Sequence, residues 1–164
     1  MAVDMFLKLD GIKGEATDGK NNPSHNDEIR VLAWSWGMSN SGSAHLGSGA
    51  GSGKVNVQDL SFTKYIDLAS PELMLSCCSG THIKKAQLTV RKASGGSPLE
   101  YVIIKLEEIL VASVSTGGSG GEDLLTENVT LNFAKVDVEY TQQVGDKAGA
   151  KKMMGWDIPA NAKR

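Results

Sequence analysis

Apolar and polar residues alternate along much of this chain, and that alternation is the main guide to its fold. Residues 3–10 place Val, Met or Leu at every second position from Val3, with charged residues at several positions between them, which is typical of a strand with one buried face. Further strands are predicted at residues 29–38, 54–62, 85–92, 99–114, 127–140 and 153–158. Turn-rich loops are predicted between them at residues 18–27, 94–97, 116–123 and 141–151.

Three of the predicted strands have a more complicated apolar pattern. In residues 29–38, alternation places Val31 and Ala33 on one face and Trp34 and Trp36 on the other. In residues 54–62 the apolar positions shift by one residue part-way along, and such a phase change favours a β-bulge. The apolar positions of residues 127–140 change phase as well.

One helix is predicted between two clear boundary signals. Ser70 is a good N-cap, Pro71 suits the first helical position, and Gly80 follows as a C-terminal stop. The expected apolar face contains Leu73, Met74, Cys77 and Cys78.

Many strands, short turns and a single helix predict a mainly β fold. The expected architecture is a single β-barrel, formed by two packed antiparallel sheets, with the α-helix packed on its side. Several strands, such as residues 99–106, are apolar on both faces. Coverage by the helix and loops explains this for one strand. For three or four such strands we favour burial against other subunits.

Composition and charge exclude several functional classes. The chain has 164 residues, a formal net charge of −2 and 22% charged residues, so it lacks the basic surface expected of a nucleic-acid-binding protein. No segment has the length and apolarity of a membrane span, and the N-terminus lacks the apolar core of a signal peptide. Its two cysteines, Cys77 and Cys78, are adjacent, which excludes a disulfide framework and suits folding in the cytoplasm.

The segment Gly37–Gly53 is an unusually long loop between two strands. It contains six glycines and five serines in seventeen residues. Long loops without secondary structure are uncommon in compact domains unless they are functional or disordered. We therefore expect an arm that becomes ordered against another molecule.

Three patterns resemble catalytic or ligand-binding motifs, and each lacks an essential part. Residues 47–54 resemble a phosphate-binding loop, but the required first Gly and the Ser or Thr after the Lys are missing. Ser119 lies in a G-x-S-x-G pattern, but every histidine precedes it and a strand follows it. Cys77, Cys78 and His82 lack the second ligand pair of a zinc site. We therefore predict no catalytic residue, no metal and no cofactor.

Four stretches of the chain resemble the Hcp family of bacterial type VI secretion systems: residues 1–10, 31–67, 75–80 and 113–133. The resemblance implies one Hcp-like tube domain over residues 1–164, with a β-barrel and one helix. It implies hexameric rings that stack into a tube, which a contractile sheath expels with a spike protein of the VgrG type at its tip. Small effector proteins can bind in the lumen. The chain would be made in the cytoplasm and secreted without a cleaved signal peptide, with no nucleic-acid partner and no membrane insertion.

The resemblance also suggests roles for particular residues. Met38, His45 and Leu46 are the candidates for contact between the extended loop and a neighbouring subunit. Ser35 is a candidate for the lumen, or is a small residue in a packed sheet. A ring-stacking loop is expected at Gly117, Gly118, Ser119, Gly120, Gly121, Glu122 and Asp123. Two alternatives remain: a ring-shaped effector carrier without a tube role, and a hydrolase using Ser119.

Overall fold

The structure is a computed structural model that describes residues 3–18, 23–42, 53–92 and 98–164. Its strands are β1 (Val3–Leu9), β2 (Ile29–Ser35), β3 (Met38–Ser39), β4 (Asn56–Val57), β5 (Leu60–Tyr65), β6 (His82–Lys92), β7 (Leu99–Thr116), β8 (Thr126–Val144), β9 (Lys147–Asp157) and β10 (Ala162–Lys163). Helix α1 (Ala69–Ser79) and the short 3-10 helix η1 (Pro23–His25) complete the fold.

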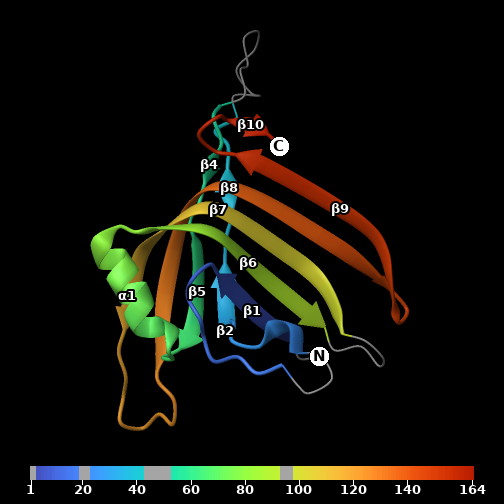
Figure 1. Ribbon diagram of the computed structural model, residues 1–164. Helices are drawn as coiled ribbons and strands as arrows, with labels where there is room; N and C mark the ends of the chain where they lie inside the picture. The colour runs from blue at the N-terminus through green and yellow to red at the C-terminus, as the bar shows by residue number, and fades with distance from the viewer. Residues whose placement is uncertain (1–2, 19–22, 43–52, 93–97) are drawn as a thin grey trace.

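Six strands close into a barrel. Their order is β8-β5-β2-β1-β6-β7, and β7 pairs again with β8 to complete the circle. All of these pairings are antiparallel. Strands β9 and β10 extend the sheet beyond β8, strands β3 and β4 form a separate pair, and α1 packs beside the barrel against β7 (Figure 1). The predicted mainly β barrel with one helix is therefore confirmed.

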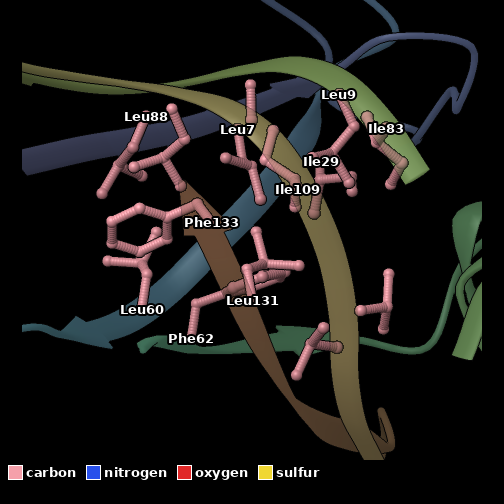
Figure 2. Close-up of a cluster of buried hydrophobic side chains, with 14 of the residues drawn as sticks. Leu7, Leu9, Ile29, Leu60, Phe62, Ile83, Leu88, Ile109, Leu131 and Phe133 are labelled. Atoms are coloured by element: carbon pink, nitrogen blue, oxygen red, sulfur yellow. The ribbon is translucent and has the colours of Figure 1, made fainter. Parts of the chain in front are cut away.

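Leucine, isoleucine, valine and phenylalanine side chains fill the barrel. Figure 2 shows them pointing toward one another between the strands that surround them. The side chains drawn there include Leu7, Ile29, Phe62, Leu88, Ile109 and Leu131, all nearly inaccessible to solvent. Burying one such side chain contributes about 1.5–3 kcal/mol, so the interior is the main source of stability.

The long strands β7 and β8 contribute side chains to the core along most of their length. In both strands the buried positions shift by one residue near the middle of the strand. In β8, Phe133 and Val136 are both buried although they lie three residues apart. In β7, Leu106 and Ile109 are both buried in the same way, and Glu108 between them has a φ of +55°. The predicted phase change in residues 127–140 therefore occurs, and β7, which pairs with β8, has a matching shift in its buried positions.

Two predictions about the other strands are wrong. The pairing of β2 with β5 shifts register between Val31 and Ala33, so Val31 is buried and Trp34 also packs against the core. Strict alternation had put them on opposite faces. Residues 54–62 do not form one bulged strand, because β4 pairs with β3 whereas β5 pairs with β2 and β8.

Helix α1 begins differently from the prediction and ends as predicted. Leu68 occupies the N-cap position without a side-chain cap, and Ser70 lies inside the helix with a buried hydroxyl. Gly80 ends the helix with a φ of +68°, a conformation that glycine adopts without strain. Cys77 packs against the core but Cys78 is exposed, so the predicted apolar face is too wide.

A layer outside the barrel accounts for part of the two-sided burial. We call residues 11–18 and 23–28 the outer strap. His25 of the strap stacks on Phe6, which points away from Leu7, and both strand residues are buried. The chain's own loops thus cover the second face of β1, a strand for which alternation predicts only one buried face. On β7, Tyr101 and Ile103 remain only partly buried.

The predicted loop at residues 141–151 is instead part of a long hairpin. Strand β8 runs to Val144, the turn contains Gly145 with a φ of +59°, and β9 begins at Lys147. The predicted strand at residues 153–158 is therefore only the end of β9. The predicted turn at residues 94–97 lies outside the described residues.

Candidate assembly surfaces

The outward side of four barrel strands carries a surface of short, uncharged side chains. Two rows of directly paired residues cross β2, β5, β8 and β7. We call these eight residues the hydroxyl face: Ser35, Ser61, Thr130 and Ser113 in one row, and Ala33, Thr63, Asn128 and Ser115 in the other. Their side chains share one side of the sheet because directly paired residues in an antiparallel sheet lie side by side.

Hydrogen bonds between neighbouring strands organise this face. The Thr63 hydroxyl donates to Asn128 Oδ1 at 2.6 Å, and the hydroxyls of Ser61 and Thr130 lie 3.4 Å apart. Ser35 is exposed, whereas Trp34 and Trp36 on either side of it pack against the core. Sequence reasoning found Ser35 alone. The other seven residues could be grouped with Ser35 only once the register between the strands was known, and the sequence does not reveal that register.

A second surface surrounds the start of the Gly/Ser loop. Met38 is 46% exposed on the short β3–β4 pair. The Trp36 indole N–H donates to the Gln58 carbonyl at 2.9 Å and holds the base of this pair. Met38 also lines an apolar groove with Trp36, Val57, Val136, Met154 and Trp156. His45 and Leu46, the other two candidates for this contact, lie outside the described residues.

The third surface is the loop between β7 and β8, at the other end of the barrel from β4 (Figure 1). Its predicted stacking residues, Gly117 to Asp123, are all exposed, and the loop continues with exposed Leu124 and Leu125. The Glu122 N–H donates to the Ser119 carbonyl at 3.1 Å, and the Leu125 carbonyl accepts from the Ile66 N–H at 2.9 Å. The loop therefore has a defined turn and is joined to the segment before α1.

The residues considered for catalysis do not assemble into a site. Ser119 forms part of the exposed turn just described, and Cys78 and His82 are exposed near the end of α1 and the start of β6. Within the described part of the chain, no group of three or more His, Cys, Asp or Glu side chains is arranged to hold a metal ion. None of the described helices has the length and apolarity needed to cross a membrane.

Two buried charge clusters were missed at the sequence level. The Lys64 ammonium donates to the Ser70 hydroxyl at 3.0 Å and pairs with Glu127, and both charged side chains are almost completely buried. This cluster explains why Ser70 does not cap the helix. Arg91 donates two hydrogen bonds of 2.8 Å to Asp18, and these outweigh burial and hold the pKa of Asp18 below its usual value.

Comparison with known proteins identifies the family. A protein-family model described as "Type VI secretion system effector, Hcp" matches residues 6–140, which is most of the chain. The chain is a member of the Hcp family. The resemblance seen in the sequence is thus confirmed. Hcp is a secreted component of the type VI system and not a known enzyme family.

Individual relatives match over nearly the whole chain. Protein hcp1 of Pseudomonas aeruginosa is 60% identical over 163 residues, which is 98% of this chain and 98% of that protein. The crystal structure of Hcp1 from Salmonella typhimurium is 42% identical with a TM-score of 0.81, and the match covers 100% of both chains. A structure described as a type six secretion system protein is 31% identical with a TM-score of 0.89, covering 99% of this chain and 100% of that one.

Proposed function

We propose that this chain is the structural subunit of a type VI secretion inner tube, with residues 1–164 as one tube domain. Six copies form a ring, rings stack into a tube, and a contractile sheath drives the tube out of the cell behind a VgrG-type spike protein. The subunit is made in the cytoplasm and leaves with the tube, without a cleaved signal peptide. No step requires catalysis by the chain.

The observation that carries this proposal is the placement of the second and third surfaces at opposite ends of the barrel. The β4 end and the loop at residues 117–125 lie at opposite ends of the molecule (Figure 1). Two different surfaces at opposite ends suit head-to-tail contacts, which extend indefinitely when they do not close into a ring. Exposed apolar side chains at both ends, such as Met38 and Leu124, favour protein contacts there.

The hydroxyl face supports a second role as an effector carrier. We place it on the lumen side of the ring, with Ser35 at the β2 end of one row. Its eight side chains are short and uncharged, and the row from Ser35 to Ser113 crosses four strands. A wide surface without charges and without large side chains leaves room for a cargo and provides hydroxyl groups for hydrogen bonds to it.

The stacking claim is tested by reversing two charges in the loop. Glu122→Arg combined with Asp123→Arg puts two long, positively charged side chains into the proposed contact between stacked rings. We therefore expect rings of unchanged mass that no longer grow into tubes. Light scattering and electron microscopy measure the two properties separately. Asp146→Arg, in the exposed β8–β9 turn, is the matched control and should leave tubes intact. Loss of rings, or normal tube growth, would contradict the assignment of this loop.

The carrier role is tested by adding a charge to the hydroxyl face. Ser35→Lys should leave the ring mass unchanged, because Ser35 is exposed, and should reduce the amount of small effector that co-purifies with the ring. Thr81→Lys, exposed just after α1, is the control. Unchanged co-purification with Ser35→Lys would reject the carrier role and leave the tube role standing.

A further inference from the structure

His25 lies at the junction between the outer strap and the barrel, in an arrangement that the tube role does not require. Its side chain is buried, with 5% of the residue exposed. Nδ1 lies 2.7 Å from Glu28 Oε2, and Nε2 lies 2.6 Å from Glu100 Oε1. The ring stacks on Phe6 with centroids 4.6 Å apart and planes inclined by 4°. Both ring nitrogens are therefore occupied by carboxylates while an aromatic ring covers one face.

This geometry defines the protonation state of the imidazole. A carboxylate can only accept a hydrogen bond, and a neutral imidazole has a single N–H to donate. Only the doubly protonated, positively charged ring can donate to Glu28 and Glu100 at the same time. Such charge-assisted hydrogen bonds are short and stronger than neutral ones, which agrees with both distances.

The charged groups around His25 come from every element packed against it. Glu28 belongs to the strap, and Glu100 belongs to β7. Asp18 of the strap accepts a hydrogen bond from the His25 backbone. Arg91 of β6 lies 5.0 Å from the Phe6 ring centroid and pairs with Asp18 and with Asp4 of β1. The carboxylates that contact the imidazole directly are Glu28 and Glu100, and their negative charges favour its protonated form.

His25 is also one of the residues that attach the outer strap to the barrel. Backbone hydrogen bonds join the two halves of the strap to each other: Gly14 N–H to Asp27 O, Ala16 N–H to Glu28 O, and Asp27 N–H to Ala16 O, at 2.8–3.0 Å. Side-chain ion pairs then join the strap to the barrel, through His25 to Glu100 on β7 and through Asp18 to Arg91 on β6. Loss of the first connection would release one of these two attachments.

We propose that His25 is a protonation-controlled clamp, which holds the outer strap on the barrel when the imidazole is charged and loosens it when the ring becomes neutral. Loosening the strap would uncover Phe6 and the outer face of β1 and β6. The proposal concerns the single subunit and does not depend on ring formation.

The direction of the pH effect follows from the surroundings. Burial lowers the pKa of His25, but the hydrogen bonds and charges of Glu100 and Glu28 outweigh it, so the pKa is raised above its ordinary value of about 6.5. A raised pKa stabilises the closed strap fully at pH values below the ordinary pKa. That stabilisation is lost as the pH rises through the raised pKa. The clamp therefore opens on the alkaline side.

Hydrogen exchange of the full chain, followed by mass spectrometry, tests the clamp. Peptides that contain Gly14, Ala16 and Asp27 report on the strap, and peptides from β8 report on the barrel. Rates are divided by the intrinsic rate at each pH, so that only opening is compared. Between the ordinary and the raised pKa, strap opening should increase by up to about tenfold per pH unit and then level off, while β8 protection stays constant.

Variants separate the clamp from a merely structural histidine. In His25→Gln the strap should already be loosened near neutral pH, and its protection should no longer depend on pH. Glu100→Gln should narrow the pH range over which opening increases, whereas Glu72→Gln, at an exposed glutamate of α1, should behave like the wild type. A strap whose protection is independent of pH in the wild type, or a pH dependence that persists in His25→Gln, would overturn the proposal.

Discussion

The interior of the barrel and the surfaces at its ends differ in which side chains they bury: the interior buries a charged pair, whereas the ends leave large apolar side chains exposed. Inside, Lys64 and Glu127 are both buried, and each finds its partner within the same chain. At the ends, Met38 and Leu124 are large apolar residues that remain exposed. The interior is therefore complete in one subunit, whereas the ends are not. Substitutions inside should unfold the chain, and substitutions at the ends should change its assembly.

The largest effect is expected from breaking the buried ion pair. Glu127→Leu removes the fully buried carboxylate of the cluster and leaves the Lys64 ammonium with Asp67 alone, at 2.9 Å, which should lower the free energy of unfolding by up to about 3–5 kcal/mol. Adding Lys64→Met should recover much of this loss, because the buried ammonium that lost its main partner is then gone as well. Urea unfolding at one fixed chain concentration measures both, since assembly itself contributes to stability. A double variant no more stable than Glu127→Leu would show that the ion pair is not the source of the loss.

A matched pair of substitutions in α1 compares buried and exposed positions directly. Leu73 is 0% exposed and Leu75 is 67% exposed on the same helix. Leu73→Ala should lower the free energy of unfolding by about 2–5 kcal/mol, because it leaves a cavity in the core. Leu75→Ala should change it by no more than about 0.5 kcal/mol. Equal effects in the same urea experiment would mean that α1 does not pack as described.

The Asp18–Arg91 pair sharpens the comparison through its pH dependence. Since the pKa of Asp18 is lowered in the folded chain, its ion pair stabilises the fold above the ordinary pKa and ceases to do so as the pH falls through the lowered value. Asp18→Asn should cost about 1–3 kcal/mol at neutral pH, because Arg91 keeps only Asp4. The stabilities of variant and wild type should converge in acid. A difference that is constant from neutral to acid pH would argue against the ion pair.

The smallest effect on folding is expected at the β3–β4 pair. Met38→Asp should leave the far-ultraviolet circular dichroism spectrum unchanged, because Met38 is exposed, but it should weaken the contact with a neighbouring subunit. Native mass at decreasing concentration measures that contact. Leu75→Asp, an exposed apolar position on α1, is the control and should keep the wild-type mass. A wild-type mass for Met38→Asp would remove this residue from the contact.

Local signals in the sequence predicted the local features well. Gly80 ends α1 because the terminal position requires a positive φ, and that requirement depends on neighbouring residues alone. The positions of β1, β2, β6 and β7 followed from alternation to within a few residues, and the closed barrel followed from the number and spacing of the strands. The resemblance in residues 31–67 and 113–133 then predicted the family.

Features that depend on contacts between elements were missed or predicted wrongly. Ser70 has the sequence of an N-cap, but its hydroxyl is used by Lys64 and Glu127. The β8–β9 hairpin was predicted as a loop because residues 141–151 are mostly polar or small, and pairing with β8 overrides that weak propensity. The hydroxyl face required the register of four strands. Ser70 and the hydroxyl face therefore depend on residues that are distant in the sequence, such as Glu127, whereas the hairpin depends on pairing between two consecutive strands.

The native mass of the purified wild-type chain tests the central claim most directly. Light scattering on a sizing column should give six times the chain mass of 17.4 kDa, because we propose that the incomplete surfaces at the ends of the barrel belong to a hexameric ring and its stack. A mass of 17.4 kDa at every concentration tested would contradict the account. The exposed apolar residues at the ends of the barrel would then need another explanation.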